Sequence, residues 1–244
     1  MARQTAAERL KYRMQSGQEA VAAGQLERAV AEWSAALRSA QRLPVTESLR
    51  TTLQNNLAAL YHSLGRQSQA RRMYQLALST AEREHGRASQ PVATILNNLA
   101  ELARAGGSPA DAEPLFRSAL EILERLPGAS KQQVAGVLAN TAECLREQGR
   151  LDETCALNAR ALSLLESSVA AIGPKGVLLN NMAQIETERR NYPEAIELHR
   201  RALASLEQAG TAFEDQRRIA LVNFASTLRN YAVSIEGQLG AKPK

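Results

Sequence analysis

An asparagine recurs through most of this 244-residue chain at a nearly constant interval. The intervals are 42, 42, 41 and 42 residues, and an alanine follows each asparagine by two positions; the asparagines are Asn56, Asn98, Asn140, Asn181 and Asn223. A period of about 40 residues is typical of arrays in which one helical unit is copied and stacked. We therefore expect a stack of repeats, each contacting its neighbours, in place of one central core.

A second pattern shows what each repeat contains. A small residue is followed four positions later by a bulky one and seven positions later by alanine, as in Ala29, Trp33 and Ala36. These offsets share one face of a helix. A break precedes this helix in every repeat, at Gly24, Gly65, Gly107, Gly149 and Arg190–Asn191. Because glycine suits the left-handed turn that ends a helix, each repeat is predicted to be a helix A, a tight turn and a helix B.

The small residues also predict how the two helices pack. Antiparallel helices approach to about 8 Å only where the side chains at their crossing are small. In this pattern of small residues at the crossing of two helices, the chain resembles the tetratricopeptide repeat (TPR) family. Leu-Asn-Asn-Leu-Ala at 96–100 and Ala-Glu-Pro-Leu-Phe-Arg-Ser-Ala-Leu-Glu-Ile at 112–122 are similar to repeats of the kinesin-light-chain type. The resemblance covers roughly residues 10–235 and implies an all-α fold, a right-handed α-solenoid of antiparallel helix pairs.

The period also predicts the organisation of the chain. We expect one repeat domain over residues 1–244, with repeats at about 7–43, 46–86, 90–127, 131–168 and 174–209. A terminal helix at 213–237 matches the A position through Asn223 and Ala225 but has no B partner. It is expected to cap the stack; the alternative is that the chain is a piece of a longer array.

Several classes of function are disfavoured. No phosphate-binding glycine loop, nucleophile elbow, zinc-protease motif or Cys-x-x-Cys motif is present, so we expect no enzyme, no cofactor and no metal site. His199 falls in the bulky column and is predicted to be a packing residue. Although 30 basic residues face 25 acidic ones, no basic run is interleaved with aromatic residues, which disfavours nucleic acid as a partner.

The sequence also bears on location. No segment is apolar enough to predict a membrane span, and no signal-peptide core is found. Two cysteines fit a reducing compartment. We therefore expect a cytoplasmic protein. The interior of a mitochondrion or another organelle is the alternative, because the first 14 residues hold four basic side chains and one acidic one.

The asparagines are the candidate binding residues. A side chain two positions from the alanine points about 200° away from it on a helix, and hence away from helix B. The resemblance implies that A helices line a concave surface and that related scaffolds hold ligand backbones with asparagines at this position. A carboxamide both donates and accepts hydrogen bonds, as a peptide backbone requires. The alternative is that the asparagines bond to the neighbouring helix and set the stacking of the repeats.

Further polar groups lie close to this column. Asn55, Asn97 and Asn180 precede three of the asparagines, and Arg104, Arg146 and Arg229 follow four residues after the alanines. The arginines could bind acidic side chains of a ligand. Glu101 and Glu143 precede two of them by three residues, so each such pair could instead satisfy itself.

These observations predict a protein–protein interaction scaffold. The favoured hypothesis is an adaptor that binds a peptide or a helix of a partner protein in a concave groove, with the asparagines and arginines as its contacts. The alternative is a structural assembly subunit that uses its convex face and its terminal helix. The sequence leaves the oligomeric state open.

Overall fold

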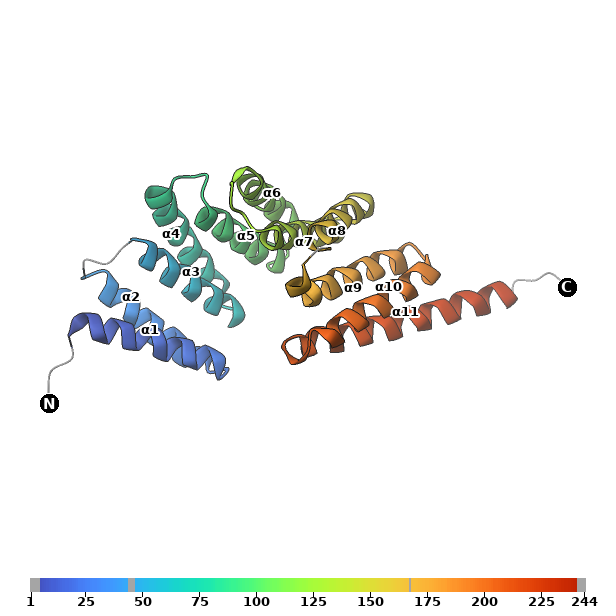
Figure 1. The fold of residues 1–244 in the computed structure, drawn as a ribbon, viewed down its shortest axis with the longest axis horizontal. Helices are drawn as coiled ribbons and strands as arrows, with labels where there is room; N and C mark the ends of the chain where they lie inside the picture. Colours follow the sequence, from blue (N-terminus) through green and yellow to red (C-terminus); the bar gives the residue numbers. More distant parts are fainter. Residues whose placement is uncertain (1–4, 44–46, 167, 241–244) are drawn as a thin grey trace. The chain divides into compact units, whose positions relative to one another are not determined.

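The computed structural model of the chain describes residues 5–43, 47–166 and 168–240 (Figure 1). Within these ranges, all regular secondary structure is helical. The residues form two compact units, Met1–Ala129 and Ser130–Lys244. The all-α repeat architecture predicted from the sequence is confirmed, whereas the assignment of the chain to a single domain stays a prediction. Residue 46, the predicted start of the second repeat, residue 167 of the fourth, and residues 1–4 and 241–244 lie outside the described ranges.

The first unit consists of three helix pairs. They are α1 (Ala6–Ala22) with α2 (Leu26–Ala40), α3 (Glu47–Ser63) with α4 (Gln67–His85), and α5 (Gln90–Ala105) with α6 (Pro109–Arg125). Each B helix also packs on the A helix of the next pair, so α2 contacts α3 and α4 contacts α5. The core is therefore spread along the unit, as expected for stacked repeats.

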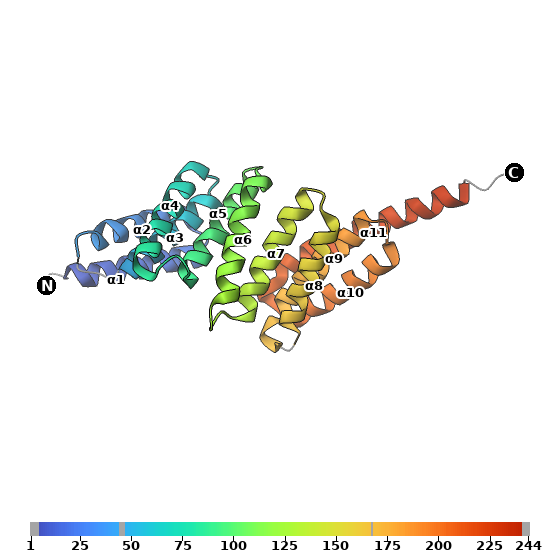
Figure 2. The same cartoon turned by 90° about the horizontal axis from the view of Figure 1, so that it is seen from above.

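The second unit has two helix pairs and a longer last helix. The pairs are α7 (Lys131–Glu147) with α8 (Leu151–Leu165) and α9 (Ile172–Glu188) with α10 (Tyr192–Gln208). Short 3-10 helices, η1 (Val169–Ala171) and η2 (Thr211–Phe213), precede α9 and α11 (Glu214–Gly240). Helix α11 packs on both α10 and α9. Figure 2 shows α11 running past the end of α10 within this unit.

Local sequence signals explain where several helices begin. Thr5 caps α1 and Ser130 caps α7, each through a reciprocal capping box with the residue three positions later. Pro109 and Pro193 lie in the first turn of their helices, where a missing N–H group costs nothing.

The small-residue columns form the contacts between helices A and B. Their alanines are fully buried, in A helices at Ala58, Ala100, Ala142 and Ala183 and in B helices at Ala29, Ala36, Ala70, Ala77, Ala112, Ala119, Ala161, Ala195 and Ala202. The bulky side chains Tyr74, Phe116 and His199 are buried beside them. Ala225 in α11 is exposed, because no B helix follows α11 within the described residues.

The tight turns follow the predicted positions. Gly24, Gly65, Gly107 and Gly149 have backbone φ angles between +69° and +81°. Arg190 takes the same position in the last pair with φ +62°, and among the described residues it is the one non-glycine residue in this conformation.

Among the described helices, none is both long enough and apolar enough to cross a bilayer.

Candidate protein-binding surface

The asparagines of the first unit are bonded to each other across helices. The carboxamide Nδ2 of Asn98 in α5 donates to Oδ1 of Asn55 in α3 at 2.9 Å. Asn97 donates to Oδ1 of Asn98 at 3.4 Å. These three side chains and that of Asn56 are half-buried. The A helices α3 and α5 are thus joined by a hydrogen bond between residues one repeat apart.

The same contact recurs in the second unit. Asn223 in α11 donates to Oδ1 of Asn180 in α9 at 3.4 Å, again across 43 residues of sequence. Asn180 is buried, whereas Asn140, Asn181 and Asn223 are half-buried. At Asn98 and Asn223, the structure therefore contains the bond to a neighbouring helix that we gave as the alternative to ligand binding.

Two of the three candidate arginines are held by glutamates of their own helices. Arg104 forms a bidentate ion pair with Glu101 at 2.6 and 3.0 Å, which is the alternative to ligand binding that we named for this pair. Arg146 does the same with Glu143 at 2.7 and 3.0 Å. The hydrogen bonds that Arg146 donates to Glu143 are the main cause that raises the pKa of Arg146 above its ordinary value. To bind an acidic group of a ligand, either arginine would have to break its existing ion pair with glutamate.

Two features distinguish the other members of this column. Arg146 also reaches Glu188 in α9 at 2.8 Å, a contact between repeats that the sequence analysis did not predict. Arg229 in α11 is exposed, and within residues 5–43, 47–166 and 168–240 no carboxylate lies within ion-pair distance of it. Of the three, Arg229 is the one placed to meet an acidic partner without breaking an existing pair.

A cavity of about 300 Å³ lies beside Asn140 in the second unit. Its walls come from α7, α9, the end of α8 and η2, and are mainly apolar: Ala135, Gly136, Ala139, Leu165, Pro174, Val177, Leu178 and Phe213, with Gln132 and Asn140 as the polar groups. A Cβ atom built on Gly136 would meet no atom within 4 Å, so this wall opens to space. The cavity therefore places an apolar depression next to Asn140, one of the candidate binding residues.

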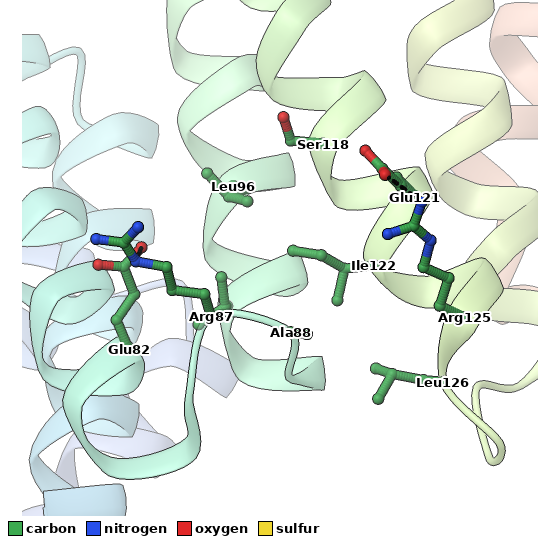
Figure 3. A pocket seen from close by; sticks show the side chains of 10 residues that line it. Glu82, Arg87, Ala88, Leu96, Ser118, Glu121, Ile122, Arg125 and Leu126 are labelled. Carbon is green, nitrogen blue, oxygen red and sulfur yellow. Dashed lines mark ion pairs between the residues drawn. The ribbon is translucent and has the colours of Figure 1, made fainter.

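A larger cavity, of about 450 Å³, lies in the first unit among α4, α5 and α6 (Figure 3). Its apolar lining is Val92, Leu96, Ile122 and Leu126. Two ion pairs flank it, Glu82 with Arg87 at 4.0 Å and Glu121 with Arg125 at 2.7 Å. None of the asparagines or arginines selected from the sequence lines this cavity. Sequence reasoning missed it because residues 86–89, which supply part of the wall, belong to a link that breaks the repeat pattern.

Family models for the tetratricopeptide repeat match most of these helices. One matches residues 91–168, and a second matches residues 50–91 and 177–209. The chain belongs to the tetratricopeptide repeat family. Solved structures that share its fold include kinesin-light-chain-like TPR repeats. TPR arrays are protein–protein interaction scaffolds and in general are not enzymes.

Solved structures share the TPR fold at low sequence identity. BtubC (BKLC) from P. vanneervenii is 21% identical with a TM-score of 0.69, over 86% of this chain and 94% of that one. A putative kinesin light chain with nearly identical TPR-like repeats from Podosopora anserina is 15% identical with a TM-score of 0.68, over 85% and 99%. A Rap protein complexed with Competence and Sporulation Factor gives 14% and 0.74, over 91% of this chain and 59% of that chain. No curated protein sequence matches this chain.

Other polar contacts join neighbouring repeats. The hydroxyls of Thr187 and Thr227 lie 2.8 Å apart, and Arg66 pairs with Glu27 at 2.7 Å. Arg189 pairs with Asp152. The separations in sequence are 37 to 40 residues, close to one repeat. A search for complementary polar residues about one period apart could have found these contacts, although it would also have returned many pairs that do not meet.

His199 completes the contact between α10 and α11. Its imidazole is buried, its Nε2 lies 3.0 Å from the hydroxyl of Thr227, and its ring lies 5.3 Å from that of Phe224. Burial lowers the pKa of His199 to about 4. The side chain is therefore neutral at physiological pH, and its burial agrees with the predicted packing role.

Proposed function

We propose that this TPR chain is a non-enzymatic adaptor that binds a peptide segment of a partner protein on its A-helix surface. By A-helix surface we mean the side of the A helices that carries the asparagines: α3 and α5 in the first unit, and α7, α9 and α11 in the second. The observation that carries the proposal is the cavity beside Asn140. It pairs a carboxamide with an apolar depression, which are the two elements that capture of an extended peptide requires.

The size and lining of this cavity define the expected ligand. A depression of about 300 Å³ with mainly apolar walls suits one large apolar side chain. The carboxamide of Asn140 at its edge can bond to the backbone on either side of that side chain, whatever the rest of the peptide sequence. The ligand is therefore a peptide with an apolar anchor residue.

The other asparagines divide into two roles in this proposal. Asn98 with Asn55 and Asn223 with Asn180 hold neighbouring A helices in place. Asn98 donates one hydrogen bond and accepts one, which leaves half of the capacity of a carboxamide for a ligand. Asn56 and Asn97 add polar groups on α3 and α5 of the first unit, and Asn181 adds one on α9 of the second.

Charge refines the ligand class. Because Arg229 is exposed on α11 and has no described acidic partner, it favours an acidic residue in the ligand. Arg104 and Arg146 add little to affinity, since their pairs with Glu101 and Glu143 must be exchanged for new ones.

Peptides selected from a random phage-display library on the folded wild-type protein test the proposal. The selected sequence, labelled with a fluorophore, is titrated by fluorescence anisotropy against wild type, Asn140→Ala and Gly136→Leu. Gly136→Leu places a side chain at the mouth of the cavity from a position where a Cβ meets nothing. We expect each variant to weaken binding at least about tenfold, equivalent to about 1.4 kcal/mol.

Asn230→Ala is the matched control, because Asn230 is an exposed asparagine outside the repeated column. It should bind as wild type does. If Asn140→Ala and Gly136→Leu retain full affinity while circular dichroism shows them folded, the binding site is elsewhere and the cavity has no part in it.

A second candidate function is favoured by α11. Six of the nine most exposed large apolar residues in the described chain lie on this helix. This distribution suits an assembly subunit that docks through its terminal helix. Deletion of residues 211–244 would abolish such docking and leave peptide binding at Asn140 weakened only by the loss of Phe213 and Arg229, whereas Asn140→Ala would leave docking intact.

A further inference from the structure

Helix α11 carries an exposed stripe of apolar side chains with a basic residue at one end and an acidic residue at the other. The stripe, which we call the α11 seam, is Arg217, Leu221, Ala225, Leu228, Ala232 and Glu236. Its spacings of four, four, three, four and four residues keep all six side chains within about 100° of the helix circumference. Leu221 is 47% exposed and Leu228 is 44% exposed. The seam therefore presents apolar side chains to solvent along a helix of 27 residues.

The seam corresponds to the face with which other A helices bind their B helix. In α7 the residues Leu138, Ala142 and Leu145 have the spacing of Leu221, Ala225 and Leu228, and all three are buried against their neighbours. Alanines at the position of Ala225 have no exposed surface in the other A helices, whereas Ala225 is exposed. The α11 seam thus has the composition of a helix-binding face and lacks a helix among the described residues.

The order of residues along the seam indicates which helix fits. Read from the N-terminus, it is basic, large, small, large, small, acidic. When a second copy of the seam is laid antiparallel, with the twofold axis between residues 226 and 227, each class meets its complement. Leu221 then faces Ala232 of the second copy, Ala225 faces Leu228, and Arg217 faces Glu236. Large residues opposite small ones let two helices pack closely, and the end charges have opposite sign.

We propose that α11 pairs with α11 of a second copy of this chain to form an antiparallel, twofold-symmetric dimer through the seam. Such an interface is isologous: each contact between unlike residues occurs twice. Val222 and Val233, which are 65% and 62% exposed, flank the seam and extend the apolar contact. The pair of Arg217 with Glu214 at 2.8 Å does not oppose the pairing, since both side chains are solvent-exposed and such pairs contribute little.

Sedimentation velocity on the full chain, over a concentration range reaching hundreds of micromolar, tests the proposal. We expect a reversible monomer–dimer equilibrium for the wild type. Arg217→Glu and Glu236→Arg, each made alone, place like charges together at both ends of the interface and should weaken dimerisation at least tenfold. The double variant reverses both charges, restores the opposite pairing and should return the dimer to near the wild-type affinity.

Two further variants test whether a loss of dimerisation comes from the seam itself, from the change in net charge or from unfolding. Arg71→Glu makes the same charge change at an exposed residue of the first unit and should leave dimerisation unchanged. Leu228→Asp should abolish dimerisation while circular dichroism shows an unchanged helix content. A wild type that stays monomeric at every concentration overturns the proposal and assigns the seam to another protein or to a further repeat. A dimer that the single charge reversals leave intact overturns it as well, because the contact then lies elsewhere.

Discussion

At the scale of the residue, the first helix pair shows how the repeat adjusts to its largest side chain. Trp33 stands where other repeats have tyrosine, phenylalanine, asparagine or histidine, and Gly17 stands where other A helices have alanine. A Cβ atom on Gly17 would lie 2.2 Å from the indole ring of Trp33. The indole Nε1 also donates to the carbonyl of Met14 at 3.1 Å, which holds the ring in place. The absence of a Cβ atom at Gly17 therefore leaves the space that the indole ring of Trp33 occupies.

We expect Gly17→Ala to destabilise the first unit. Overpacking against the tryptophan costs about 1–3 kcal/mol, which outweighs the gain of up to about 1 kcal/mol from the better helix propensity of alanine. Trp33 is the only tryptophan of the chain, so its fluorescence during urea unfolding reports on this site.

Gly136→Ala is the matched control for this prediction. Gly136 is also within a helix, but a Cβ there meets no atom within 4 Å, so the substitution should stabilise the protein by up to about 1 kcal/mol. The interpretation fails if Gly17→Ala proves as stable as wild type. It also fails if Gly17→Ala/Trp33→Phe, whose urea unfolding is followed by circular dichroism because it lacks the tryptophan, recovers nothing.

Arg190 is a second residue with a local conformational cost. It adopts the left-handed turn conformation for which the equivalent positions in the other pairs have glycine. Arg190→Gly should raise the free energy of unfolding by about 1 kcal/mol, because a side chain in this conformation costs about 1–2 kcal/mol. Thermal unfolding followed by circular dichroism measures the change.

The reverse substitution provides the control. Gly149→Arg, at φ +76° and with no atom near its Cβ, should destabilise by a similar amount through the backbone alone. Equal stability of Arg190→Gly and wild type would mean that the arginine side chain makes a compensating contact.

At the scale of the element, polar contacts one repeat apart set the position of each helix on its neighbour. Helix α11 shows this most clearly. The hydroxyl of Thr227 lies within hydrogen-bond distance of both Thr187 in α9 and His199 in α10. Tyr231 also stacks on Tyr192 at a centroid distance of 5.3 Å. These contacts fix the rotation of α11 about its own axis, and with it the direction in which the α11 seam points.

The buried His199 makes this docking sensitive to acid. Its pKa is about 4 in the folded protein, because burial disfavours the imidazolium, against about 6.5 for an exposed histidine. Between these values the unfolded chain binds a proton that the folded chain does not. The contribution of His199 to stability is therefore complete above pH 6.5 and should fall by about 1.4 kcal/mol for each unit as the pH decreases toward 4.

Urea unfolding at a series of pH values measures this slope. His199→Phe, which follows the phenylalanine of the equivalent position Phe116, should remove it. His62→Gln is the control, since it removes a histidine whose side chain is only half-buried. A slope in the His199→Phe variant equal to that of wild type would assign the acid sensitivity to other groups.

The helices themselves were predictable from the sequence, but their polar contacts were not. The 0, 4, 7 pattern and the glycine breaks depend on residues close together in the chain, and they located the A and B helices. The role of Asn98 depends on whether its carboxamide reaches Asn55, which the packing of α3 on α5 decides. The same holds for Arg146 and Glu188. The cavity beside Asn140 was missed because Phe213, which closes part of its wall, comes from η2, a segment outside the repeated columns.

At the scale of the whole molecule, the chain consists of two compact units. In stacked repeats, each helix pair is stabilised mainly by its immediate neighbours, so a local defect need not spread through the array. Phe116 lies in α6, within the first unit, and Leu138 lies in α7, within the second; both side chains are fully buried. These two residues allow the coupling between units to be measured.

We expect Phe116→Ala and Leu138→Ala each to loosen mainly its own unit. Such truncations cost about 3–5 and 2–5 kcal/mol respectively. Hydrogen exchange followed by mass spectrometry should show faster exchange over residues 5–129 for Phe116→Ala and over residues 130–240 for Leu138→Ala. Equal acceleration in both halves by either variant would instead support a single cooperative domain, as the sequence analysis predicted.

The sequence by itself determined the fold class, the family and the order of the helices, because those depend on periodic small residues and on local helix signals. The tertiary structure decided which polar side chains join repeats, where cavities form and which apolar faces stay exposed. These features depend on distances between residues about 40 positions apart, and such distances are set by the packing of whole helices. The α11 seam illustrates both: its residues can be read from the chain, but its exposure follows from which face of α11 meets α9 and α10.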